Sequence, residues 1–151
     1  MGITKEMEAK LQAPLPAEAI TKHPTKTYLS SIKGIYITER LNEVFGTGGW
    51  KIRAEFVKDY VSDKADKNGH FSTMVVTKTT LEIPEYDVYY ECFGGNDNDD
   101  LGDAFKGATT DAISKIGSFL GIGIDVYKGK NNSSKGVNDA TGDPLKDDFN
   151  L

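Results

Sequence analysis

Three polar side chains that can hydrogen-bond a phosphate recur one helical turn apart in the segment LGDAFKGATTDAISKIGSFLG, residues 101–121. Lys106, Thr110 and Ser114 follow the spacing i, i+4, i+8, so a helix here would carry them on one face. Lys115 falls on the shoulder of the same helix, beside small residues. The pattern is typical of a surface that holds an anion, and it would equally suit an ordinary solvated helix face.

A second group of residues with possible chemistry is the acidic stretch between residues 97 and 103, which could bind a divalent cation. As an EF-hand loop that starts at Asp97 it fails twice, because Leu101 holds the fifth position and Ala108 the twelfth. Carboxylates at the start of a helix are also favoured by the helix dipole without any metal. A metal-dependent nuclease that uses this stretch is therefore the weaker of the alternatives.

No arrangement of nucleophile, base and acid emerges from the sequence. His23 and His70 lie far apart in loop-like contexts, and the single cysteine, Cys92, sits in a strand-like run where a buried, inert thiol is expected. The glycine-rich turns GTGG and GIGI lack the full phosphate-loop patterns. The residues alone therefore support no catalytic claim and no metal site.

Composition favours one globular domain. The chain has 151 residues, of which 38% are hydrophobic and 10% aromatic, enough to form a core. Its 18 Lys and Arg against 23 Asp and Glu argue against a general polyanion binder, although net charge says little about one local groove. No apolar run approaches the roughly 20 residues of a membrane span, and no signal peptide is visible, so we expect a cytoplasmic protein without membrane contact.

Apolar periodicity predicts helices at 3–12, 34–45 and 99–120. The second helix ends at Gly46, where the GTGG turn leads into Trp50. The last helix is rich in small residues, which would let it approach its own sheet or a neighbouring protomer closely. Its expected apolar side comprises Leu101, Phe105, Ala108, Ala112, Ile116 and Phe119.

Alternating and β-branched runs predict three strands, at 50–61, 71–83 and 86–93. Asn68-Gly69 is a hairpin signal between the first two, and residues 94–100 are expected to form a polar loop. The predicted class is α+β: an antiparallel three-stranded sheet packed on a long helix, a β-β-β-α core with N-terminal helices. In the first strand one face should carry Ile52, Ala54 and Phe56, and the other Lys51, Arg53 and Glu55.

The last part of the chain loses hydrophobic periodicity. We expect a folded domain over residues 1–127 and a disordered polar tail over 128–151. The ending DPLKDDFNL is acidic with two late apolar residues, which is typical of a segment that docks on a partner.

Two motifs in order resemble the Rad52/Rad22 family of single-strand annealing proteins, the phage and bacterial branch most closely. One is the helix ending in Phe45-Gly46 before Trp50, and the resemblance spans roughly residues 25–127. The other follows the strands and has the family type Lys-x-Ala-x-Thr-Asp-Ala-Leu-Lys-Arg. Its matching residues here are Lys106, Ala108, Thr110, Asp111, Ala112, Ile113 and Lys115.

The resemblance implies a homo-oligomeric ring that binds single-stranded DNA in an outer groove and anneals complementary strands during recombination and repair. It also implies a protein that needs no cofactor and is not an enzyme. It places Lys106, Thr110 and Lys115 on the groove. Ser114 and Ser118 stand where family members carry further basic residues. The best compensating cations are Lys51 and Arg53, then Lys33 and Arg40, and Tyr36 could stack on a base.

The resemblance also suggests partners for the acidic ending, with a single-strand binding protein or another recombination factor as the candidate. An interaction adaptor that does not bind DNA is the main alternative function.

Overall fold

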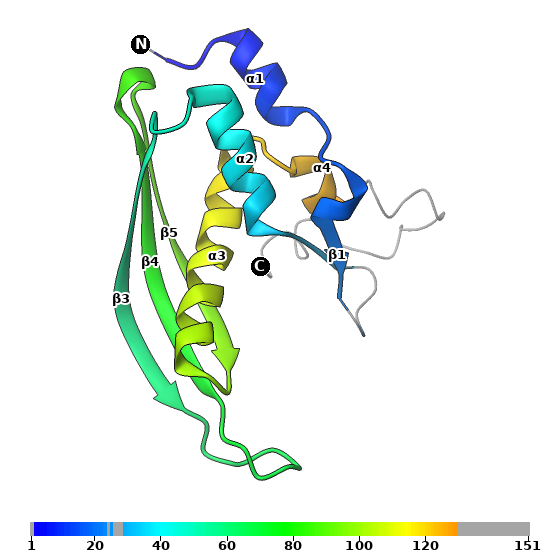
Figure 1. Ribbon diagram of the computed structural model, residues 1–151, viewed down its shortest axis with the longest axis vertical. Helices are drawn as coiled ribbons and strands as arrows, with labels where there is room; N and C mark the ends of the chain where they lie inside the picture. Colours follow the sequence, from blue (N-terminus) through cyan, green and yellow to red (C-terminus); the bar gives the residue numbers. More distant parts are fainter. Residues whose placement is uncertain (1, 24, 26–28, 130–151) are drawn as a thin grey trace.

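A computed structural model describes residues 2–23, 25 and 29–129 of the chain. The fold is α+β, as predicted: a three-stranded antiparallel sheet packs on one face against a long helix, and the other helices lie on that same side (Figure 1). In chain order the elements are α1 (Lys5–Gln12), η1 (Ala17–Ala19), β1 (Ile20–Lys22), β2 (Ser30–Ile32), α2 (Gly34–Phe45), β3 (Lys51–Val61), β4 (Thr73–Ile83), η2 (Pro84–Tyr86), β5 (Val88–Asn98), α3 (Leu101–Phe119) and α4 (Ile124–Tyr127).

The main sheet has the order β3-β4-β5, so β3 and β5 are both edge strands. Burial alternates along β4: Val75, Thr77, Thr79, Leu81 and Ile83 are buried and face the helices. The even-numbered residues between them face the other way. Among the described residues nothing covers this face, because the helices lie on the opposite side of the sheet (Figure 1); we call it the bare face.

Small residues let α3 approach the sheet closely. Ala104, Ala108 and Ala112 are fully buried. A Cβ placed on Gly94 of β5 would lie 2.0 Å from the carbonyl oxygen of Ala108, so only glycine fits at that position. The small-residue face of α3 is therefore used within the chain and is not available to a neighbouring protomer.

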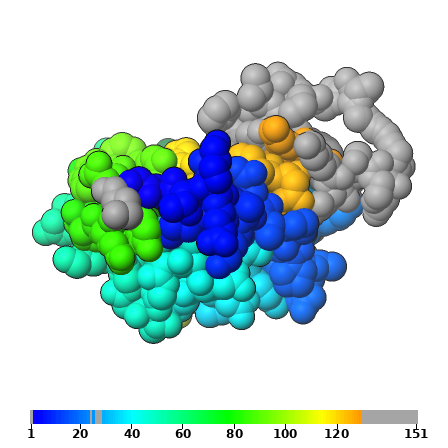
Figure 2. All heavy atoms as spheres, turned by 90° about the horizontal axis from the view of Figure 1, so that it is seen from above, coloured from blue at the N-terminus to red at the C-terminus, as the bar shows by residue number. Residues whose placement is uncertain are grey.

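The helices at one end share a core with the C-terminal part of α3. Its buried members are Leu11, Ile32, Ile37, Leu41, Phe45, Leu81, Ile83, Ile116, Leu120, Ile122, Val126 and Tyr127. The segment carrying α1 lies across this end of the molecule against α2, as Figure 2 shows in dark blue and cyan. Trp50, which follows the predicted GTGG turn, donates from its indole nitrogen to Asn42 Oδ1 at 2.8 Å.

The largest difference from the sequence prediction is the end of β5. The strand continues to Asn98, whereas residues 94–100 were expected to form a loop. Gly94 and Gly95 pair with Thr77 and Val76 in register with β4, and the close approach of α3 requires a residue without a side chain at Gly94. Polar, glycine-rich composition therefore does not distinguish a loop from a strand on which a helix packs closely.

Smaller differences concern short elements and helix ends. The β1–β2 hairpin and α4 were not predicted from the sequence. The first helix begins at Lys5 rather than residue 3, because the Thr4 hydroxyl caps it by accepting from the Met7 amide at 3.1 Å. Leu101 and Phe119, expected on the apolar side of α3, are about half exposed. The predicted tail, apart from Lys128 and Gly129, lies outside the described residues.

Candidate nucleic-acid interface

Lys106 and Thr110 lie on the side of α3 that faces the start of α2. Lys106 is 80% exposed and pairs only loosely with Asp103, at 3.5 Å. Thr110 follows one turn later and meets the backbone of α2: a Cβ placed on Gly34 would lie 2.8 Å from the Thr110 methyl carbon. Lys106 and Thr110 therefore lie on the same side of α3 as Gly34, the first residue of α2.

The start of α2 adds two further features to this line. Lys33 is the N-cap residue and is exposed, and no side chain caps the helix. A helix N-terminus carries partial positive charge and amide hydrogens that point outward, which favours a phosphate. We call Lys33, Gly34, Thr110 and Lys106 the α2–α3 strip. Of the predicted site residues, the structure brings Lys33, Thr110 and Lys106 together here.

Lys115 is not part of the strip. It lies nine residues after Lys106, which at about 100° per residue places it on the opposite side of the helix. Its ammonium lies 3.3 Å from Asp111 Oδ2 and 3.4 Å from the carbonyl oxygen of Phe93 on β5. Within a single chain the structure therefore does not bring Lys106 and Lys115 together, and their shared groove stays a prediction.

Arg40 is a structural residue. Its side chain is 10% exposed, and Nη1 donates to the carbonyl oxygens of Lys10, Leu11 and Ala13 at 2.9, 3.0 and 2.8 Å. Because these hydrogen bonds hold the Arg40 side chain at the end of α1, this residue is no longer available as a DNA contact. Tyr36 is half-buried and lies about 200° around α2 from Gly34, so it does not join the strip.

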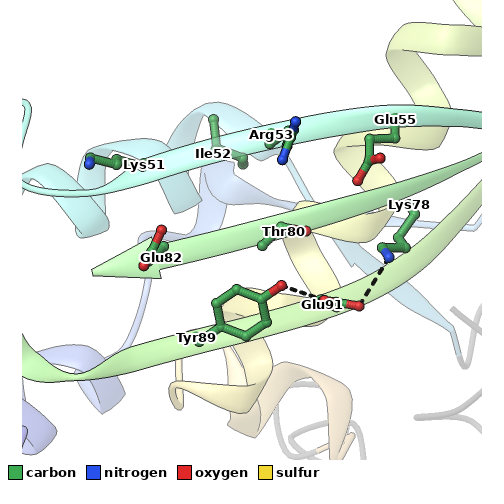
Figure 3. Close-up of a pocket in the computed structure, with 9 residues that line it drawn as sticks. All are labelled: Lys51, Ile52, Arg53, Glu55, Lys78, Thr80, Glu82, Tyr89 and Glu91. Carbon is green, nitrogen blue, oxygen red and sulfur yellow. Dashed lines mark hydrogen bonds and ion pairs between the residues drawn. The ribbon is translucent and has the colours of Figure 1, made fainter. Parts of the chain in front are cut away.

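Lys51 and Arg53 lie on the bare face of the sheet, opposite α3. In the β3–β4 register Lys51 pairs with Glu82, Arg53 with Thr80 and Glu55 with Lys78, so these residues share that face (Figure 3). The sheet itself separates them from Lys106. Within one chain they therefore do not join Lys106, and the hypothesis that they complete its groove stays a prediction.

The bare face is also balanced in charge rather than basic. Lys78 lies 3.3 Å from Glu91, and Tyr89 donates a short hydrogen bond to the same carboxylate (Figure 3). That hydrogen bond and the nearby Lys78 ammonium lower the pKa of Glu91, which stays ionised at neutral pH. Carboxylates interleaved with the cations disfavour a polyanion here.

Ser114 and Ser118, which stand where family members carry basic residues, are not free surface side chains. Ser114 is only 8% exposed, although its spacing from Lys106 and Thr110 predicted a polar face. The Ser118 hydroxyl donates to the carbonyl oxygen of Lys115 at 2.6 Å. A lysine at position 114 would place its ammonium against the core, so adding the family's charge there should destabilise the fold rather than strengthen the strip.

The acidic stretch is divided among structural roles. The Asp100 carboxylate accepts from the Asp103 amide at 2.9 Å and caps α3, and Asp99 lies 3.7 Å from His70. Within the described residues there is no group of three or more His, Cys, Asp or Glu side chains placed to hold a metal ion. Burial raises the pKa of the Cys92 thiol, as expected of an unreactive cysteine.

Sequence reasoning missed two features of the site. The uncapped start of α2 could have been suspected from Lys33-Gly34-Ile35, because no Ser, Thr, Asp or Asn precedes the helix. The second feature is Asp111, whose Oδ2 accepts the Gly95 amide at 3.0 Å. That contact depends on the unpredicted extension of β5.

Comparison with known proteins gives one result on the family. The family model described as Rad52/22 family double-strand break repair protein matches residues 4–144, which includes all helices and strands of the described structure. No curated protein matches the chain at a significant level. Among the described residues, no helix combines the length and apolar character needed to cross a membrane.

Proposed function

The chain belongs to the Rad52/22 family of double-strand break repair proteins, and we propose that it binds single-stranded DNA and anneals complementary strands. Membership confirms the family resemblance drawn from the two sequence motifs, and it supports a role in DNA repair and recombination. The phage and bacterial branch stays a prediction. Annealing changes no covalent bond, so the proposal needs neither a catalytic group nor a cofactor.

The observation that carries the proposal is the α2–α3 strip. It combines an exposed lysine at each end, the uncapped N-terminus of α2 and the Thr110 hydroxyl, all of which donate to anions. Such donors contact phosphates whatever the base, and they leave the bases free to pair with a second strand. Sequence-blind contact of this kind is what annealing requires.

We expect the purified chain to bind single-stranded DNA and to accelerate annealing. The measurement follows a fluorescent oligonucleotide first in a mobility-shift assay and then as it pairs with its complement. Affinity should be similar for poly-T and mixed sequence, and should fall as salt rises, because phosphate contacts release counterions. Tight binding without faster pairing of the strands would show that the chain binds single-stranded DNA but does not anneal it. Absence of binding at low salt would favour the adaptor function.

We further propose that copies of the chain assemble, as the resemblance to ring-forming proteins implies. Because α3 packs on β4 and β5, the helix-facing side of β3 projects beyond it. Ile52, Phe56 and Val61 on this side are 41%, 56% and 58% exposed. We call these three residues the β3 overhang. The ring of Phe105 on α3 lies 5.6 Å from that of Phe56.

Asp59 shares this side of β3, but the exposed apolar side chains beside a free strand edge favour a second copy as their occupant. We therefore expect light scattering to give the mass of many subunits, and Phe56→Asp to reduce it to that of one or two chains. The matched control is Phe93→Asp, since Phe93 is 58% exposed on the bare face and should leave the mass unchanged. A wild-type mass of one or two chains, with or without DNA, would contradict the assembly.

A further inference from the structure

The free edge of β5 is covered at its centre by two side chains of α3. An edge strand presents unpaired amide and carbonyl groups, which invite a further strand to add. At this edge Asp111 Oδ2 accepts the Gly95 amide at 3.0 Å, and the Lys115 ammonium donates to the Phe93 carbonyl oxygen at 3.4 Å. A strand that extended the sheet beyond β5 would need these same two backbone groups.

The two side chains hold each other in place. Asp111 and Lys115 are one turn apart on α3, their charged groups are 3.3 Å apart, and their side chains are only 24% and 23% exposed. The Phe93 carbonyl also accepts from the Cys92 thiol, at 3.4 Å. An exposed i, i+4 pair contributes only a few tenths of a kcal/mol to a helix. Here the pair additionally satisfies an edge amide and an edge carbonyl, which a plain surface ion pair does not do.

The opposite edge differs. All eleven residues of β3 are exposed, and the β3 overhang lies next to its edge. The sheet therefore has one edge that is covered at its centre and one that is open.

We propose that Asp111 and Lys115 seal the β5 edge against strand addition by a second copy of this chain. Copies of the chain would then assemble in an ordered way through the β3 overhang. This role of the overhang rests on the proposed self-assembly. The seal also gives Lys115 a role different from the phosphate contact that the family resemblance implies. Its ammonium is committed to a carboxylate and a carbonyl of its own chain.

The first test measures the seal in a single chain. Amide hydrogen exchange at Gly95 should accelerate roughly tenfold or more in Asp111→Ala, because the amide loses its acceptor. Asp111→Asn should keep most of the protection, since the amide oxygen can still accept. Unchanged exchange at Gly95 in Asp111→Ala would overturn the proposal. This readout does not depend on DNA binding, and exchange is compared at a protein concentration at which variant and wild type have the same particle mass, so it separates the seal from the proposed function.

The second test measures assembly by light scattering. The double variant Asp111→Ala/Lys115→Met should give larger and more heterogeneous particles whose size grows with protein concentration. Lys5→Ala/Glu8→Gln, which removes an exposed ion pair of α1, is the matched control and should behave like wild type. Particles of wild-type size in the double variant would overturn the seal.

A single variant keeps the test decisive if the double variant fails to fold. Lys115→Met retains the apolar stem and the Asp111–Gly95 bond, and should still broaden the particle distribution. It should leave the salt dependence of single-strand affinity unchanged. If Lys115→Met lowered the slope of log affinity against log salt, Lys115 would be a DNA contact, and its assignment to the seal would be overturned.

Discussion

Replacing Arg40 with alanine is expected to lower the free energy of unfolding by about 3 kcal/mol, because buried carbonyl groups lose a charged donor. Arg40 Nη1 donates to Lys10, Leu11 and Ala13, and Nη2 to Pro14 at 3.4 Å. The carbonyls of Lys10 and Leu11 belong to the last turn of α1, where few backbone amides remain to donate to them; the Lys10 carbonyl also accepts from the Ala13 amide at 3.4 Å. Thermal unfolding should show a midpoint lower by roughly 10 °C.

Two variants control for charge alone. Arg40→Lys keeps the positive charge but has no planar fork to reach several carbonyls, so it should recover only part of the loss. Glu43→Gln removes the carboxylate 3.3 Å from Arg40 Nε, but Glu43 is 65% exposed, and the change should cost about 0.5 kcal/mol or less. If Arg40→Ala unfolded like wild type and bound single-stranded DNA more weakly, Arg40 would be a DNA contact after all.

Arg40 illustrates what the sequence could not supply. As an isolated arginine on a predicted amphipathic helix it looked like a surface cation, because only tertiary packing places the end of α1 above it. The helix itself was predicted with its bounds, 34–45, since Ile37, Leu41 and Phe45 follow helical spacing and Gly46 ends it. Periodicity therefore locates an element, whereas the partner of a long polar side chain depends on contacts distant in sequence.

The candidate site shows the same division. Thr110 and Lys106 were predicted together because they are one turn apart on one helix. Lys51 and Arg53 were correctly placed on the polar side of their strand, but the sequence does not say that the helix packs on the other side. Ser114 was misplaced because its spacing puts it near Thr110, while the packing of α2 against α3 buries that part of the helix.

The strip itself provides the prediction with the largest effect on function. Lys33→Ala and Lys106→Ala should each reduce the slope of log affinity against log salt by roughly 0.7, the value for one lost phosphate contact on a single strand. The double variant should lose roughly tenfold in affinity at moderate salt. The loss should be equal on poly-T and mixed sequence, because phosphates carry no base information. Titrations at several salt concentrations measure both quantities.

The matched controls are Lys51→Ala and Arg53→Ala, which remove cations from the bare face of the sheet. They should leave the salt slope unchanged, since the sheet separates them from the strip and Glu55, Glu82 and Glu91 surround them. Melting temperature and particle mass should match wild type in the lysine variants of the strip, because Lys106 makes only an exposed ion pair. If the sheet-face variants lowered the slope and the strip variants did not, DNA would run along the bare face. The start of α2 would then be only a helix end that packs on Thr110.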